Sequence, residues 1–192
     1  MGPLILASSS PRRRQLLEML GIPVQVIPSN IPEELQNGES PIEYSLRLAR
    51  AKVSQVPGSP VLGADTIVVL GREILEKPGD AGHALEILRK LQGQTHEVVT
   101  SVALRCDGVV RDRTDVTRVT FRPADDEWLR EYIRTGEPMD KAGAYGIQGY
   151  GAALIERVEG DFFGVMGLPI RLVLDLLAEA GYRYGFGAGL VG

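Results

Sequence analysis

The stretch "SPVLGADTIVVLG", residues 59–71, decides the fold class, because it is the most apolar strand pattern in the chain. Two polar residues, Asp65 and Thr66, interrupt it at the middle. A buried carboxylate without a partner costs several kcal/mol. Asp65 therefore either caps a backbone turn at the end of the strand or does chemistry, by holding a metal or accepting a proton from water. Thr66 points to the opposite face unless the backbone bends there.

Strand and helix patterns alternate on both sides of this stretch. Further strands are predicted at residues 3–8, 21–29, 95–106, 109–122 and 153–160, and helices at 11–20, 41–55, 80–93, 124–136 and 168–181. In the helix at 41–55, a capping box of Ser40 and Glu43 marks the start. Its buried face is predicted to contain Ile42, Leu46, Ala49 and Val53. This order predicts an α/β protein with a mixed sheet and flanking helices.

Length and composition limit the possible classes of protein. A chain of 192 residues suits one domain, with room for two lobes. We assign this domain to residues 1–184. Residues 185–192 lack periodicity and are predicted to form a flexible tail. The net charge of −4 and an aromatic content of 6% argue against a nucleic-acid-binding protein. No apolar run is long enough to span a membrane, and no signal-peptide pattern is present, so we expect a cytoplasmic protein without a membrane partner.

The few cysteine and histidine residues argue against two further kinds of site. Cys106 is the one cysteine, which excludes an internal disulfide and fits a reducing compartment. Its strand-like surroundings favour a small buried side chain over a nucleophile. With only His83 and His96 besides, the ligands of a structural zinc site are lacking. His96 alternates with Val98, which favours a strand histidine with satisfied hydrogen bonds over a catalytic one.

The segment "ASSSPRRRQLLEML", residues 7–20, predicts an anion-binding site. Ser10 suits the helix N-cap and Pro11 the first helical position. Arg12, Arg13 and Arg14 then follow in a turn where the helix dipole disfavours cations. They form either a solvated face or, together with the serine hydroxyls and free N–H groups, a site for an anion such as phosphate.

Other polar residues allow two interpretations each. Lys52 lies at the flank of its helix's apolar face, where its head can reach into a cleft or stay in solvent. Lys77, before a proline, is expected to be extended in a loop. Glu33, like Glu34, lies in a polar loop where solvated carboxylates are the rule. In "KAGAYGIQGYG", residues 141–151, the glycines permit close approach to a planar ligand, and Gln148 offers an amide, but a plain connector would look the same.

Eight motifs, in order along nearly the whole chain, resemble those of the Maf-type nucleotide pyrophosphatases, also called septum-formation inhibitor proteins. They are "LASSSPRRRQLL" (6–17), "PEE" (32–34), "LARAKV" (48–53), "LGADTIV" (62–68), "EKP" (76–78), "LQGQTHEVVT" (91–100), "DKAGAYGIQG" (140–149) and "GLPI" (167–170). The resemblance implies an elongated mixed-sheet α/β fold, with two lobes around a cleft, and a homodimer. It leaves the tail unmatched and gives Arg14 no role.

The same resemblance implies an activity, which is metal-dependent hydrolysis of nucleoside triphosphates to the monophosphate and pyrophosphate, with Mg²⁺ or Mn²⁺. Within the family, the chain resembles the branch that acts on dTTP and UTP. The resemblance lies in the arginine after Ser-Pro, the threonine after the aspartate and the motif "YGIQG". The implied roles are proton acceptor and metal ligand for Asp65, metal ligand for Glu33, catalytic cations for Lys52 and Lys77, phosphate binding for Ser8 and Arg13, and base specificity for Arg12, Thr66 and Gln148.

Two alternatives remain open beside this interpretation. A non-catalytic nucleotide-binding regulator of septum formation needs the same anion site but not Asp65. A pyrophosphatase with another base preference, such as 7-methyl-GTP, would keep the family's chemistry and differ in the residues that contact the base.

Overall fold

The computed structural model describes residues 2–191 and divides the chain into two compact units. The first unit is formed by Met1–Asp65, Thr100–Asp115 and Gly167–Gly192, and the second by Thr66–Val99 and Val116–Met166. The boundary falls between Asp65 and Thr66, so the two polar residues inside the apolar strand belong to different units.

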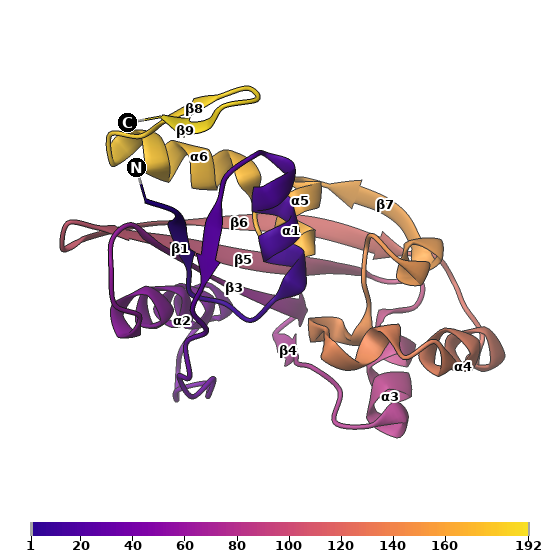
Figure 1. The fold of residues 1–192 in the computed structure, drawn as a ribbon. Helices are drawn as coiled ribbons and strands as arrows, with labels where there is room; N and C mark the ends of the chain where they lie inside the picture. Colours follow the sequence, from indigo (N-terminus) through magenta and orange to yellow (C-terminus); the bar gives the residue numbers. More distant parts are fainter. Residues whose placement is uncertain (1, 192) are drawn as a thin grey trace. The chain divides into compact units, whose positions relative to one another are not determined.

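A mixed sheet contains seven strands (Figure 1). They are β1 (Leu4–Leu6), β2 (Val24–Val26), β3 (Val61–Leu70), β4 (Glu73–Leu75), β5 (Thr95–Cys106), β6 (Val109–Phe121) and β7 (Ile155–Glu159). Their order is β2-β1-β3-β5-β6-β7, and β4 pairs with β3. β1 runs parallel to β2 and β3, whereas β4 is antiparallel to β3 and β7 to β6. The predicted mixed α/β class is confirmed.

Five helices begin within two residues of their predicted starts, whereas the short helix at Phe162–Met166 was not predicted. The helices are α1 (Pro11–Met19), α2 (Pro41–Gln55), α3 (Ala81–Leu91), α4 (Asp126–Arg134), α5 (Phe162–Met166) and α6 (Ile170–Glu179). The capping box before α2 is formed by Ser40 and Glu43, as predicted. Asp80 and Asp125 cap α3 and α4 through their side chains. None of the helices within residues 2–191 combines the length and apolar character that crossing a membrane requires.

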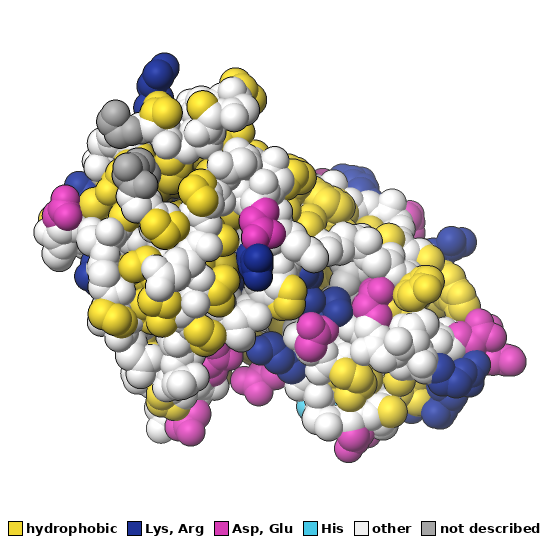
Figure 2. Space-filling view, viewed as in Figure 1, with side chains coloured by type: hydrophobic (Ala, Val, Ile, Leu, Met, Phe, Trp, Pro, Cys, Tyr) yellow, Lys and Arg dark blue, Asp and Glu magenta, His cyan; other side chains and the backbone are white. Residues whose placement is uncertain are grey.

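Each unit has its own apolar core. In the first, Val53 on α2 and Val61 on β3 are fully buried and belong to one cluster with Ala103 on β5. In the second, Leu88 on α3 and Phe121 on β6 are buried in a larger cluster. On the face of the molecule in Figure 2, cationic and anionic side chains are interspersed among apolar ones.

The buried face of α2 differs from the predicted one. Ala49 and Val53 are buried as expected, but Ile42 is 46% exposed and Leu46 is only half-buried, so the prediction was wrong for these two residues. The helix is rotated so that Ser45 and Lys52 point inward. Both side chains turn inward because each donates a hydrogen bond to Asp65 on β3. A prediction from hydrophobic periodicity misses this, because it counts only apolar residues.

The C-terminal segment forms a small antiparallel hairpin of β8 (Arg183–Gly185) and β9 (Gly189–Val191), which the aperiodic sequence did not predict. Tyr184 Oη donates to the carbonyl of Leu20 at 3.1 Å, which ties the hairpin to the end of α1. The flexibility assigned to residues 185–192, like the single-domain boundary at residue 184, stays a prediction.

Candidate active site

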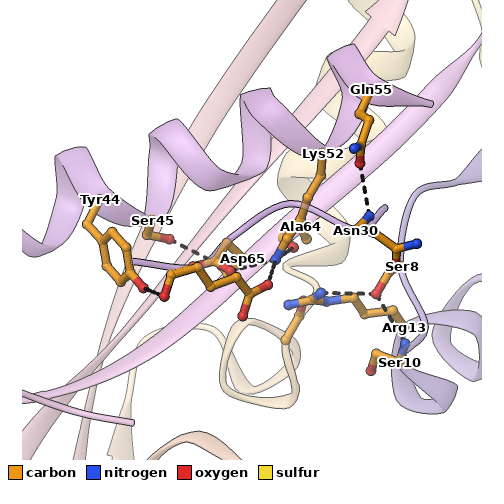
Figure 3. Close-up of polar contacts among 12 residues, drawn as sticks. Ser8, Ser10, Arg13, Asn30, Tyr44, Ser45, Lys52, Gln55, Ala64 and Asp65 are labelled. Carbon is orange, nitrogen blue, oxygen red and sulfur yellow. Dashed lines mark hydrogen bonds and ion pairs between the residues drawn. The ribbon is translucent and has the colours of Figure 1, made fainter. Parts of the chain in front are cut away.

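The turn between β1 and α1 holds Arg13 in a fixed orientation (Figure 3). Ser8 Oγ accepts hydrogen bonds from the Ser10 backbone N–H at 3.2 Å and from Arg13 Nη1 at 3.1 Å. Arg13 Nε donates to the carbonyl of Gly167 at 2.8 Å. Ser10 occupies the N-cap, as predicted, but its side chain makes no capping hydrogen bond. Ser8 therefore organises this turn.

The three arginines of the first helical turn have different surroundings. Arg14 lies at the surface and pairs with Glu18 at 2.7 Å, one helical turn away, so a local partner balances its charge. Arg12 and Arg13 are half-buried. The pKa of Arg13 lies below its usual value, chiefly because burial removes solvent; the charges of Asp65 and Glu33 oppose this effect and Arg12 adds to it. Arg13 stays protonated at neutral pH nonetheless.

A buried lysine joins two carboxylates from distant parts of the first unit. Lys52 Nζ, on α2, lies 2.7 Å from Asp65 Oδ1 on β3 and 2.7 Å from Glu33 Oε1 in the loop before α2. The side chains of Lys52 and Asp65 are 8% and 7% exposed, whereas that of Glu33 is 44% exposed. Of the two positions considered for Lys52, the structure shows the inward one, and Glu33 forms the solvent-facing side of the cluster.

The second carboxylate oxygen of Asp65 is the unusual atom of this cluster. Asp65 Oδ2 is buried and has no hydrogen-bond partner within residues 2–191. Leaving a buried acceptor unpaired costs ~1–3 kcal/mol, and such atoms are rare in folded proteins outside functional sites. A capping role for Asp65 does not account for it, because Asp65 lies inside β3 and its Oδ1 is bound by Lys52. An atom of this kind can accept a proton or bind a cation.

The packing of α2 on β3 positions Lys52 and Asp65 relative to each other. At Gly63, two residues before Asp65, an added Cβ would lie 2.8 Å from Val53 Cγ1 and 3.1 Å from the Ala49 carbonyl oxygen. Glycine thus lets the helix approach the strand closely. Ser45 Oγ donates to the Asp65 carbonyl at 3.2 Å, which fixes the strand backbone at the carboxylate.

The loop that carries Glu33 is attached to α2 by three side chains. Tyr44 Oη donates to the Glu33 carbonyl at 3.0 Å, and Arg47 Nη2 donates to the Glu34 carbonyl at 2.9 Å. At the other end of the helix, Gln55 Oε1 accepts the backbone N–H of Asn30 at 2.9 Å. Glu33 is therefore held beside Lys52 by the loop backbone as well as by its own charge.

The remaining predicted site residues belong to the second unit. Thr66, half-buried, directly follows Asp65 on β3. Lys77 is exposed in the loop after β4, as predicted, and the preceding carbonyl of Glu76 accepts the backbone N–H of Gly143 at 3.2 Å. Gln148 is exposed in the glycine-rich segment. The Lys77 loop is thus hydrogen-bonded to the segment that continues to Gln148.

His96 is a buried strand residue, as its pattern predicts. Its Nε2 and Tyr145 Oη are 2.8 Å apart, and both rings lie edge-to-face with Phe121. Burial lowers the pKa of His96 from 6.5 to about 4, so the ring is neutral at neutral pH. Its Nδ1 is buried without a partner among residues 2–191, so the prediction that its hydrogen bonds are satisfied was wrong for this atom.

The carboxylates fit a divalent cation only together with a ligand. Within residues 2–191, no three His, Cys, Asp or Glu side chains are grouped so that they could hold a metal by themselves. Mg²⁺ is commonly bound by one or two carboxylates, with water and substrate phosphates completing the shell. The unpartnered Asp65 Oδ2 and the exposed Glu33 suit that kind of binding.

Sequence reasoning did not find several residues that build the site. Gly63, Ser45 and Tyr44 act by fixing the backbone, and their partners lie far away in sequence. Gly167, whose carbonyl binds Arg13, has φ +107°, a value that favours glycine. In the sequence, only its place in the "GLPI" motif pointed to a role for Gly167 in the site.

Comparison with known proteins shows the family to which the chain belongs. The family model described as "Maf-like protein" matches residues 3–180. The dTTP/UTP pyrophosphatase of Escherichia coli strain K12 is 49% identical over 184 residues, and that of strain 536 is 50% identical, each alignment covering 93% of both chains. A nucleoside triphosphate pyrophosphatase of Shigella flexneri is 49% identical over the same length and coverage. The chain therefore belongs to the Maf-like protein family, as its motifs predict.

Proposed function

We propose that the protein hydrolyses nucleoside triphosphates, dTTP and UTP above all, to the monophosphate and pyrophosphate. The observation that carries the proposal is Asp65, a buried carboxylate with one oxygen held by Lys52 and the other without a partner among the described residues. A structural ion pair needs no such free oxygen, whereas a proton acceptor does. The similarity to the curated pyrophosphatases supports the same reaction.

In the proposed reaction, water attacks a phosphorus of the triphosphate and breaks the bond between the α- and β-phosphates, which yields the monophosphate and pyrophosphate. Asp65 Oδ2 accepts the proton from that water, and the hydrogen bond from Lys52 to Oδ1 holds the carboxylate in place. Arg13 is held by Ser8 and Gly167, and its guanidinium is proposed to bind phosphate oxygens. Its fixed guanidinium charge then offsets the negative charge that develops on those oxygens during the attack.

A divalent cation, Mg²⁺ or Mn²⁺, belongs to the proposal as well. Asp65 and Glu33 would hold it, and the bound ion would lower the pKa of water and neutralise phosphate charge. Lys52, which bridges the two carboxylates, balances their mutual repulsion. Lys77, in the second unit, is proposed to neutralise negative charge on the phosphate oxygens during the reaction.

We assign base specificity to Gln148, with Arg12 and Thr66. Uracil and thymine present an imide N–H between two carbonyls, and the Gln148 amide has both a donor and an acceptor to match them. Cytosine replaces one carbonyl by an amino group and lacks the imide proton. A site built for uracil leaves its polar groups unpaired with cytosine, at ~1–3 kcal/mol each.

A panel of triphosphates tests the proposal. Purified protein with Mg²⁺ or Mn²⁺ is expected to release pyrophosphate from UTP and dTTP faster than from CTP, GTP or 7-methyl-GTP. A protein that binds UTP without releasing pyrophosphate would be the non-catalytic regulator. Faster release of pyrophosphate from 7-methyl-GTP than from UTP would contradict the assigned base preference but would still agree with the proposed reaction.

We further propose a cytoplasmic homodimer. The lone cysteine, Cys106, is buried as a free thiol, which is consistent with a reducing compartment. Light scattering after gel filtration is expected to give twice the chain mass of 20.8 kDa. A mass of one chain would contradict the dimer.

A further inference from the structure

The segment that carries Gln148 is anchored on both sides to one pair of side chains in the second unit. Before Gln148, the Gly146 N–H donates to Tyr132 Oη at 3.1 Å. After it, the Tyr150 N–H donates to Glu137 Oε2 at 2.7 Å, and the Gly151 N–H donates to Glu137 Oε1 at 3.0 Å. Tyr132 Oη in turn donates to Glu137 Oε1 at 2.8 Å, so one carboxylate is the centre of the whole arrangement.

The glycines around Gln148 leave room for this arrangement. A Cβ added at Gly149 would overlap the carboxylate of Glu137. A Cβ added at Gly151 would lie 2.6 Å from Tyr132 Oη and 2.6 Å from the Gly146 carbonyl oxygen. The backbone on the C-terminal side of Gln148 therefore passes so close to Glu137 and Tyr132 that no side chain fits between them.

Glu137 makes these contacts as a charged group. Burial opposes its ionisation, but the hydrogen bonds from Gly151, Tyr132 and Tyr150 bring its pKa below the usual value. Hydrogen bonds to a carboxylate are shorter and stronger than those between neutral groups. The Lys141 ammonium donates to the backbone carbonyl of Glu137 at 2.6 Å, which fixes the residue from a second direction.

Gln148 itself is exposed, whereas Gly146 and Ile147 before it are buried. Its direction is therefore set by the backbone at Gly146 and Gly149–Gly151, which Tyr132 and Glu137 hold. We infer that Glu137, together with Tyr132, is a positioning residue for base recognition, because it fixes the backbone that presents the Gln148 amide to a pyrimidine. This inference rests on the proposed role of Gln148 in reading the base.

Glu137→Gln tests the inference with little change of shape. The neutral amide offers only one oxygen, and its NH₂ group would face the N–H of Tyr150 or Gly151, so at least one of these bonds is lost. Glu131→Gln is the matched control, because Glu131 lies on α4, is exposed and makes a long surface contact with Arg134 at 3.9 Å.

The first measurement is amide hydrogen exchange, which does not depend on catalysis. In Glu137→Gln, exchange at residues 146–151 is expected to accelerate about tenfold, while exchange in α3 and β5 stays as in the wild type. Glu131→Gln is expected to change neither. Unchanged exchange at 146–151 would overturn the inference, whether or not the protein hydrolyses UTP.

The second measurement is the ratio of kcat/KM for UTP to that for GTP. In Glu137→Gln this ratio is expected to fall about tenfold, through a higher KM for UTP. In Gln148→Ala the ratio falls as well, and adding Glu137→Gln to it should cause little further loss, because both changes act through one amide. Additive losses, or an unchanged ratio in an enzyme that cleaves UTP, would overturn the inference and leave the proposed reaction standing.

Tyr132→Phe is the milder variant should Glu137→Gln fail to fold. It removes the bond from Gly146 and the one to Glu137 but keeps both backbone bonds to the carboxylate. Exchange is expected to accelerate at Gly146 more than at Tyr150 and Gly151. Equal protection at Gly146 in the variant and the wild type would contradict the role of Tyr132.

Discussion

Replacing Asp65 by asparagine separates its chemical role from its structural one. The amide nearly keeps the shape of the side chain and can still accept the hydrogen bond of Lys52, which lies 2.7 Å from Oδ1. It carries no charge and cannot take up a proton from water. We expect kcat for UTP to fall by at least ~100-fold, the usual contribution of a positioned general base.

The cost in stability follows from the surroundings of Lys52. Removing one member of a buried ion pair costs ~3–5 kcal/mol when the remaining charge has no other partner. Here Lys52 keeps Glu33 at 2.7 Å, and that carboxylate is 44% exposed. We therefore expect a smaller loss of about 2 kcal/mol, which corresponds to a fall in Tm of ~4–8 °C for a chain of this size. The variant should stay folded.

The assay combines pyrophosphate release with a thermal melt. Asp112→Asn is the matched control, because Asp112 pairs with Arg50 at the surface at 2.7 Å, where ion pairs contribute ~0–1 kcal/mol. It should keep both activity and Tm. If folded Asp65→Asn retained kcat within about threefold of the wild type, the assignment of Asp65 as proton acceptor would be refuted.

Four further outcomes are expected. Arg13→Lys keeps the positive charge but loses the planar guanidinium that binds Ser8 and Gly167. The KM for UTP should therefore rise, with only a small fall in Tm. An unfolded variant would show that the role of Arg13 is mainly structural. Burial lowers the pKa of His96 to about 4, so between pH 6.5 and 4 the unfolded chain binds a proton that the native chain does not, and ~3 kcal/mol of stability should be lost over this range. Urea unfolding should show this loss for the wild type and not for His96→Gln. The same pH dependence in both proteins would contradict the prediction. Gln148→Glu removes a donor and adds charge, so competition assays should show UTP losing its advantage over CTP, and retained preference would contradict base reading by Gln148. Removing divalent ions with a chelator should abolish pyrophosphate release until Mg²⁺ or Mn²⁺ is restored, and full activity after chelation would exclude the proposed metal.

Local signals in the sequence predicted most of the element boundaries. The capping box of Ser40 and Glu43 and the proline at the first position of α1 act within one helical turn, so their effect can be read from neighbouring residues. The strand predicted at 95–106 has the bounds of β5, Thr95–Cys106. The mixed α/β class follows from the order of such elements.

Sequence reasoning missed contacts between distant residues and short elements without a periodic signal. The rotation of α2 follows from the pairing of Lys52 with Asp65, which is 13 positions away in the sequence. The spacing of apolar residues gives no information about such a pair. The hairpin of β8 and β9 and the 3-10 turns at Glu137–Asp140, Ala142–Ala144 and Tyr150–Leu154 lack a periodic signal.

Most site residues could be identified from motifs in the sequence, but the way in which they are arranged around one another could not be predicted. Spacing alone could not say which arginine of the first turn points inward; the structure shows Arg13 bound to Gly167, a residue 154 positions later in the chain. Asp65 stood out because a carboxylate inside an apolar strand conflicts with burial. Glu137 gave no such signal, because an acidic residue before a turn is ordinary until its partners are known.

Identification of the products formed from UTP by ³¹P NMR tests the central claim most directly. With the wild-type protein and Mg²⁺ or Mn²⁺, the spectrum should show UMP and pyrophosphate growing in equal amounts, and Asp65→Asn should form neither at a comparable rate. Formation of UDP and inorganic phosphate, or unchanged UTP in a protein that binds it, would contradict hydrolysis between the α- and β-phosphates with Asp65 as the proton acceptor.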